Sequence, residues 1–348
     1  MQVYVGIDVH KAKWVVSIAT ETFFYKTISV EPKAEALTSY LEHHFKSCTI
    51  HCTYEAGFSG FGLQRALPHE GYSCLVVNAS DVAMAQKDIV QKSDRSDSRN
   101  LCLQLRSGTL KGIYVPSQQQ EQLRSLFRQR NTVVKLLREP KVLIRAQLAY
   151  YGISLPAHYD NTIWSKQKLV WIKERAWNYQ TGKESLDSKL RHYAFAYQEL
   201  LHLSNTLRAY VRKTYKKDYY LLRSVPGIGP LTAIALLSEV GDLRRFSSAN
   251  HLCSYVGLVP SIYSSSDTVI NRGLTPRSKT LLRSYLVEAA WQAVRTDMEL
   301  QGYYLLHKGK PANKRIVKVA RKLLLRARAV VMREVPYQKD IVQTEAAL

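Results

Sequence analysis

Three strand-like runs lie within the first thirty residues of the chain. Residues 3–8, 14–19 and 23–30 are rich in the apolar, β-branched and aromatic side chains that favour strands. Each run follows the previous one after only a few residues, so together they predict a meander of three strands. The rest of the first domain must then be built around this sheet, because a sheet buries its apolar face only when other elements cover it.

Helical and strand-like segments alternate after the third run. Leu37, Leu41 and Phe45 recur every four residues and predict a helix over residues 33–46. The same reasoning predicts strands over 49–55 and 72–77 and helices over 60–70 and 94–106. Three strands followed by alternating helix and strand is the order of a ribonuclease-H-like fold.

Four carboxylates accompany these elements. Asp8 and Glu55 each end a predicted strand, and Asp94 and Asp97 are three residues apart, which places both on one helix face. Oxygen ligands suit a hard cation, so the four predict a Mg²⁺ site, with Mn²⁺ as an alternative ion. Four unrelated surface acids are the competing interpretation. Asp8 argues against it, because an acid that ends an apolar strand is costly without a partner.

The positive charge of the chain lies outside this region. Residues 1–110 contain 11 basic and 11 acidic side chains, so the formal net charge of +22 falls on residues 111–348. Such an excess predicts a polyanion partner, either DNA or RNA. A ribosome-associated or merely basic protein is the alternative.

The middle of the chain is predicted to be helical. An apolar stripe over residues 117–150 favours a coiled-coil arm or a bundle helix, and Pro140 predicts a kink or break in it. Residues 159–222 continue as helical segments. A basic helix over Lys314 to Arg333 is predicted to lie against nucleic acid.

A Pro-Gly-Ile-Gly-Pro turn at residues 226–230 precedes an apolar helix and resembles half of a helix-hairpin-helix. Gly227 and Gly229 would let backbone N–H groups approach a phosphate there. A Ser-rich loop is predicted at residues 260–267, where a serine hydroxyl could attack a DNA phosphate. A flexible connector is the alternative for that loop. Nearby candidates for phosphate contacts are Arg272, Arg277 and Arg283.

The five cysteines form no close pair of the CxxC type, and no apolar run reaches membrane-spanning length. The first residues already form a predicted strand rather than a signal peptide. These features predict a cytoplasmic protein with reduced thiols and no membrane partner.

Five short motifs occur in order along the chain: Gly-Ile-Asp-Val-His-Lys (6–11), Tyr-Glu-Ala-Gly (54–57), Lys-Ser-Asp-Arg-Ser-Asp-Ser-Arg (92–99), Pro-Gly-Ile-Gly-Pro-Leu-Thr-Ala (226–233) and the segment 255–265. This ordered set resembles the DEDD transposases of the insertion-sequence one-ten family, which includes the Piv-type DNA invertases. The resemblance covers nearly the whole chain.

The resemblance implies an α/β plus α architecture in three parts. A RuvC-like catalytic domain would occupy residues 1–113, a helical coiled-coil region 114–220, and a mostly helical C-terminal transposase domain 221–348. The tetrad that binds Mg²⁺ in the family falls on Asp8, Glu55, Asp94 and Asp97.

The resemblance also implies a nucleophilic serine. Counted from Tyr263, the Tyr-x-Ser-Gly segment of the family places it at Ser265. Ser266 stands where the family has glycine, so Ser264 and Ser266 remain alternatives. Further on, Pro276 and Ser278 stand where the family usually has Lys and Gly.

The predicted function is that of a site-specific DNA transposase or recombinase that forms a transient phosphoserine link. The resemblance implies a bridge RNA that pairs with donor and target DNA, and a tetramer built as a dimer of dimers, in the nucleoid of a prokaryotic cell. One rival is a metal-only nuclease of the Holliday-junction resolvase kind. Others are a Piv-like invertase without an RNA guide and a non-catalytic nucleic-acid-binding protein.

Overall fold

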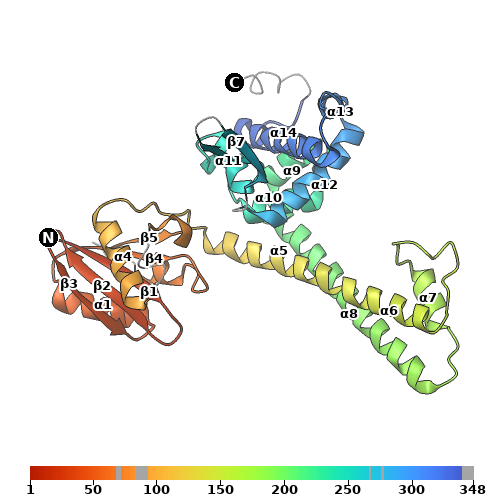
Figure 1. Cartoon of the computed structure of the whole chain (residues 1–348), viewed down its shortest axis with the longest axis horizontal. Helices are drawn as coiled ribbons and strands as arrows, with labels where there is room; N and C mark the ends of the chain where they lie inside the picture. Colours follow the sequence, from red (N-terminus) through yellow and green to blue (C-terminus); the bar gives the residue numbers. More distant parts are fainter. Residues whose placement is uncertain (68–71, 84–92, 266–267, 276–277, 339–348) are drawn as a thin grey trace. The chain divides into compact units, whose positions relative to one another are not determined.

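The computed structural model describes residues 1–67, 72–83, 93–265, 268–275 and 278–338, with 261–265 and 268–272 described by their backbone alone. The chain divides into two compact units, Met1–Val115 and Pro116–Leu348 (Figure 1). In the part of the chain that the structure describes, no helix is both long and apolar enough to span a bilayer.

The first unit is built on a five-stranded sheet in the order β3-β2-β1-β4-β5 (Figure 1). The central strand β1 pairs antiparallel with β2 and parallel with β4. The predicted meander is therefore confirmed, and the two later strands extend the sheet on the other side of β1. The strands are β1 (Gln2–Val9), β2 (Trp14–Thr20), β3 (Phe24–Val30), β4 (Thr49–Glu55) and β5 (Tyr72–Val77).

Helices cover both faces of the sheet in the first unit. Successive residues of a strand point to opposite faces, so each face of β1 packs against a different helix. Val3, Val5 and Ile7 share a core with Leu37 and Leu41, which are buried residues of α1. The alternate residues of β1 face α4, which contacts β1, β2 and β4. The helices are α1 (Ala34–His44), α2 (Gly62–Ala66) and α4 (Asp94–Arg106), with a 3₁₀ turn η1 (Ala79–Asp81).

A glycine allows α4 to approach the sheet closely. A Cβ atom on Gly6 would lie 2.2 Å from the carbonyl oxygen of Ser98 and 2.4 Å from the backbone nitrogen of Cys102. Beside this contact, Ser17, the β2 partner of Gly6, places its hydroxyl 2.9 Å from that of Ser98. The contact fixes the position of α4 along β1.

The second unit is mostly helical. Its helices are α5 (Gln118–Leu136), α6 (Arg138–Tyr150), α7 (Lys166–Lys173), α8 (Gln180–Thr214), α9 (Lys216–Ser224), α10 (Pro230–Glu239), α11 (Ala249–Val256), α12 (Thr280–Thr296), α13 (Met298–Leu305) and α14 (Ala312–Arg333), with a 3₁₀ turn η2 (Leu243–Arg245). A hairpin of β6 (Pro260–Ser265) and β7 (Thr268–Leu274) interrupts them.

Two helices in succession, α5 and α6, pack along the long helix α8 (Figure 1). The predicted break near Pro140 is confirmed, and it falls at Leu137, between α5 and α6. Pro140 lies in the first turn of α6, where a backbone N–H has no partner within the helix, so its missing N–H costs little. Leu123, Phe127, Leu207 and others belong to the same core as the C-terminal helices.

The first unit is α/β and the second is mostly helical, which confirms the predicted α/β plus α fold class. The RuvC-like identity, the coiled coil and the boundary between residues 220 and 221 stay predictions. One detail of the sequence interpretation was wrong, because residues 260–265 form a strand rather than a loop. The predicted basic helix is confirmed as α14, which also buries an apolar face, and its contact with nucleic acid stays a prediction.

The hairpin and the buried face of α14 each have a physical cause. The hairpin pairs Tyr263 with Ile270 and Ser264 with Val269, and aromatic and β-branched residues favour strand pairing despite the serines. In α14 the apolar residues recur at helical spacing and are buried, as Leu323 and Leu324 show. Arg326 of the same helix is also buried and pairs with Asp297 at 2.9 Å.

Candidate functional site

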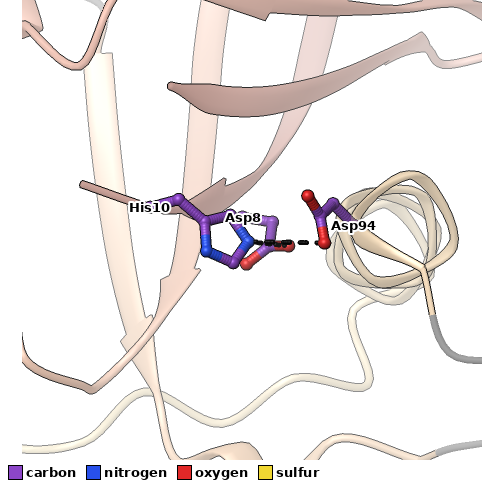
Figure 2. Close-up of side chains that lie close together, drawn as sticks. All are labelled: Asp8, His10 and Asp94. Carbon is purple, nitrogen blue, oxygen red and sulfur yellow. Dashed lines mark hydrogen bonds and ion pairs between the residues drawn. The ribbon is translucent and has the colours of Figure 1, made fainter. Parts of the chain in front are cut away.

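Two of the four predicted carboxylates meet beside a histidine at the end of β1. His10 Nε2 lies 2.9 Å from Asp8 Oδ2 and 3.5 Å from Asp94 Oδ1 (Figure 2). One ligand atom from each of Asp8, His10 and Asp94 lies within 4.8 Å of the other two. The first strand and the first turn of α4 thus bring three groups that can bind a metal to one point.

The start of α4 is well defined by its sequence. Ser93 caps the helix by accepting a hydrogen bond from the backbone N–H of Ser96, and the Ser96 hydroxyl accepts one from the backbone N–H of Ser93. This reciprocal pair satisfies two N–H groups that the helix leaves open. Asp94 and Asp97 follow in the first turn, where the helix dipole favours negative charge.

The electrostatics of the cluster centre on Asp8. Burial raises the pKa of the Asp8 carboxyl, and the charges of Asp94 and Asp97 raise it further, while the hydrogen bond and charge of His10 act in the opposite direction. A carboxylate held close to two others is repelled by them. A divalent cation would relieve this repulsion.

Glu55 and Asp97 lie near the Asp8 cluster, and their place in the metal-binding tetrad stays a prediction. Ile7 of β1 is the register partner of Tyr54 of β4, so Asp8 and Glu55 end neighbouring parallel strands. Asp97 lies near enough for its charge to act on Asp8. Among the residues that the structure describes, however, neither Glu55 nor Asp97 joins the group whose ligand atoms lie within 4.8 Å of one another.

His10 is the member of the cluster that the sequence analysis did not select. Its sequence signal is the spacing Asp-x-His, because residues two apart on a strand point to the same side. The ring is partly exposed, with 45% of its side-chain surface accessible, so it can move without opening the core.

The donor set fits a hard divalent ion. Carboxylate oxygens from Asp8 and Asp94 are ligands that Mg²⁺ and Mn²⁺ accept, and an imidazole nitrogen is a more usual ligand for later transition metals. Both carboxylates are at least partly accessible to solvent, with 22% and 49% of their side-chain surface exposed. An ion could therefore enter without rearrangement of the fold.

The predicted serine belongs to the second unit. Ser265 is the last residue of β6 and pairs in register with Thr268, so it ends a hairpin strand. Ser264 precedes it in the same strand, and Ser266 lies outside the described residues. Arg277 also lies outside them, and only the backbone of Arg272 is described, as a residue of β7.

The glycines of the Pro-Gly-Ile-Gly-Pro turn connect α9 to α10. Gly227 has φ of 90°, and a Cβ atom there would lie 2.5 Å from the Cβ of Ala293 of α12. Close packing on α12 therefore explains this glycine without a phosphate. Gly229 precedes α10 and has open space around it. Phosphate contact at either glycine stays a prediction.

Arg283 is held within the protein. Its Nη1 donates to the carbonyl oxygen of Gly257, 3.3 Å away, at the end of α11. The carbonyl at a helix C-terminus is a favourable acceptor for a cation. This hydrogen bond occupies one nitrogen of the guanidinium group, and a phosphate contact of Arg283 stays a prediction.

Comparison with known proteins agrees with these features. A DEDD-type transposase model of the IS110 group matches residues 5–153, and a model described as the transposase IS116/IS110/IS902 family matches residues 219–305. The chain belongs to the IS110/IS116 transposase family. The first match spans the Asp8 cluster and the second spans the hairpin with Ser265.

Relatives of this IS110-family chain carry consistent names. A Sinorhizobium fredii protein named as the transposase y4qE is 28% identical over 83% of this chain and 71% of its own length. The transposase for insertion sequence element IS1533 of Leptospira borgpetersenii is 26% identical over 84% and 85%. A pilin gene-inverting protein of Moraxella lacunata is 30% identical over 46% of this chain and 50% of its own length.

Proposed function

We propose that this IS110-family transposase is a site-specific recombinase that combines a metal-binding carboxylate cluster with a serine nucleophile. The observation that carries the proposal is the convergence of Asp8 and Asp94 beside His10 in a family member. Glu55 and Asp97 complete the tetrad, Glu55 from the end of the neighbouring strand and Asp97 from one helical turn beyond Ser93. The strand order of the first unit supports a RuvC-like, ribonuclease-H-like domain.

The residues of the cluster have separate tasks. Asp8, on the central strand, and Asp94, at the capped start of α4, hold two carboxylates at a fixed separation. His10 spans them through Nε2 and keeps both carboxylates oriented until a cation binds. Mg²⁺ or Mn²⁺, when bound, would stabilise the negative charge that develops on a phosphodiester during its cleavage.

The serine would take over the phosphoryl group. In this step Ser265 Oγ forms a bond to phosphorus, the bond from phosphorus to the 3′ oxygen breaks, and the serine proton is lost as the 3′ oxygen gains one. The product is a 5′-phosphoserine link, which an incoming 3′ hydroxyl reverses to complete strand exchange. No water enters, so the phosphodiester count is conserved, as recombination requires.

The proposed partners follow from charge and family. Donor and target DNA, and a bridge RNA that pairs with both, would neutralise the +22 charge of the chain. The proposed assembly is a tetramer made as a dimer of dimers. A recombinase that inverts DNA without an RNA guide is the nearest alternative, supported by the likeness to a pilin gene-inverting protein.

The test combines cleavage with covalent trapping on donor DNA. Asp8→Asn should abolish cleavage, because it removes a ligand charge while keeping the shape of the side chain. Glu35→Gln is the matched control, since Glu35 lies exposed in the first turn of α1. Full cleavage by Asp8→Asn would contradict the proposed metal site.

The serine is tested separately. Ser265→Ala should leave DNA binding intact and remove the protein–DNA adduct seen on denaturing gels. Adduct loss in Ser264→Ala or Ser266→Ala alone would move the nucleophile to that residue. Cleavage that needs Asp8 but produces no adduct with any of the three serines would identify a metal-only nuclease instead.

A further inference from the structure

Four cations gather at the C-terminal end of α10, close to one buried carboxylate. Glu239, with 1% of its surface exposed, accepts two hydrogen bonds from Arg128, at 2.7 Å and 2.8 Å. Arg124 Nε lies 3.9 Å from the same carboxylate. Arg245 and Lys279 complete the group, which is called the α10 cation cluster below.

The three arginines of the cluster have structural partners. Arg128 neutralises Glu239. Arg124 donates to the backbone carbonyls of Ser238 and Glu239, and Arg245 donates to that of Val240 at 3.2 Å. The last carbonyls of a helix carry partial negative charge, so cations at this position stabilise α10.

Lys279 has no comparable partner. Its ammonium lies 5.5 Å from the ring centroid of Tyr255, and the Arg245 guanidinium lies 4.9 Å from the same centroid. Within the described ranges no carboxylate lies at ion-pair distance from Lys279. Burial lowers the pKa of Lys279, and the charges of the three arginines lower it further, against the charge of Glu239.

The surroundings of Lys279 offer further donors. Lys279 is the residue that precedes α12, and no side chain caps the N–H groups at the start of this helix, which has no acid in its first turn. The hydroxyl of the preceding Ser278 is buried and has no hydrogen-bond partner in the described structure. Open N–H groups, a hydroxyl and an ammonium thus follow one another in the chain, and each is a donor of the kind that binds phosphate.

A purely structural role for Lys279 explains little. The end of α10 already has three arginines, and a fourth cation adds repulsion beside its contact with the Tyr255 ring and its attraction to Glu239. Titratable groups in such strained electrostatic surroundings cluster at functional sites. A ligand that uses this charge would be an anion that reaches a partly buried position.

We propose that Lys279, with Ser278 and the start of α12, binds one backbone phosphate of a nucleic acid beside the serine hairpin. The site lies near the base of the hairpin, because β7 ends at Leu274, Thr275 N–H donates to the carbonyl of Val259, and the Ser278 side chain packs at Gly257. The inference rests on the proposed recombinase function, in which a strand passes this hairpin. The phosphate anchors that strand at the base of the hairpin, whose other end carries Ser265.

The first test is the salt dependence of binding by the full chain, measured with random-sequence duplex DNA and, in a second arm, with single-stranded RNA. Lys279→Gln should weaken binding equally for all sequences and reduce the slope of log K against log salt by about one. Lys279→Arg should restore the slope. Lys216→Gln, at an exposed lysine of α9, is the control for loss of any surface charge.

The two arms identify which nucleic acid supplies the phosphate, since the slope falls only with the one that binds there. An unchanged slope in both arms, or a fall equal to that of Lys216→Gln, would overturn the proposal. Asp8→Asn should bind with the full slope. A failure of the proposed chemistry therefore appears in cleavage, and a failure of the phosphate site appears in the slope.

The second test separates a binding role from a structural one. Without nucleic acid, Lys279→Gln should melt at the same temperature as the parent protein or higher, because it removes repulsion from the α10 cation cluster. A melting temperature several degrees lower would show that Lys279 stabilises the fold, and the proposal would be wrong.

Discussion

At the scale of single residues, Gly6 decides how closely α4 can approach the sheet. The helix backbone fills the space that a Cβ atom would need, with a nearest distance of 2.2 Å. Because backbone atoms cannot rotate aside as a side chain does, any substitution must displace the helix. The position of Asp94 relative to Asp8 therefore depends on a residue that has no side chain.

Gly6→Ala should destabilise the first unit by about 1–3 kcal/mol or more, the usual cost of overpacking a core. It should also weaken cleavage, since α4 carries Asp94 away from Asp8. Urea denaturation measures the first effect. Gly62→Ala is the control, because nothing lies within 4 Å of the added methyl group in α2, and alanine favours a helix.

The sequence was sufficient to select Asp8 and Asp94, because each stands at the end of an element whose type its neighbours determine. It did not select His10, since a histidine after a strand is common and only the three-dimensional structure shows that it spans two carboxylates. Nor could it indicate that Glu55 and Asp97 lie further from the centre. The direction of a side chain depends on its rotamer and on neighbours distant in sequence.

At the scale of elements, an ion pair between half-exposed Arg128 and the buried Glu239 carboxylate joins α5 to α10. Arg128→Met would leave the Glu239 carboxylate buried without its main partner, at a cost of about 3–5 kcal/mol. Arg191→Ala, which breaks the exposed pair of Arg191 and Glu184 in α8, should cost about 0–1 kcal/mol. Chemical denaturation of both variants checks this contrast, and equal losses would contradict it.

Two titratable side chains of β5 should make the protein less stable at alkaline pH. Burial raises the pKa of Cys74 from 9.0 to about 12 and that of Tyr72 from 10.0 to about 12. The neutral forms are favoured by folding, so their contribution is complete below pH 9 and is lost as the pH rises towards 12. Denaturation at several pH values should show this decline.

Cys74→Ala should make the decline at alkaline pH less steep, because the alanine has no proton to lose on unfolding. Cys48→Ala serves as the control, since Cys48 precedes β4 and lies outside the sheet. If both variants follow the parent curve, the burial of Cys74 has no bearing on alkaline unfolding.

Most elements could be predicted because their apolar residues repeat with a clear period, as in the five strands of the first unit. The hairpin was missed because serines in its first strand outweighed Tyr263 and Ile270 in a reading of local composition. In α14, the many Lys and Arg residues drew attention away from the apolar residues that form its buried face. Arg326 counts as a surface cation in sequence, and only the structure shows Asp297 buried opposite it.

At the scale of the whole molecule, the two units divide charge as well as structure. The expectation is that residues 1–115, expressed alone, fold cooperatively and show weak, salt-independent binding to random duplex DNA. Residues 116–348 should bind it with a steep salt dependence. Fluorescence anisotropy on both fragments measures this, and strong binding by the first fragment would refute the division.

The contact between β1 and α4 has one more consequence. Gly6 lies opposite Ser98, and two residues further along β1 Tyr4 accepts a hydrogen bond from Cys102, four residues further along α4. Two strand residues and four helix residues cover nearly equal lengths, about 6 to 7 Å. The turn of α4 from Ser98 to Cys102 is therefore held against Gly6 and Tyr4. A change at Cys102, about 12 Å along the axis from Asp94, would shift the helix at this contact and move the acid without touching it, so metal preference could be tuned from outside the cluster.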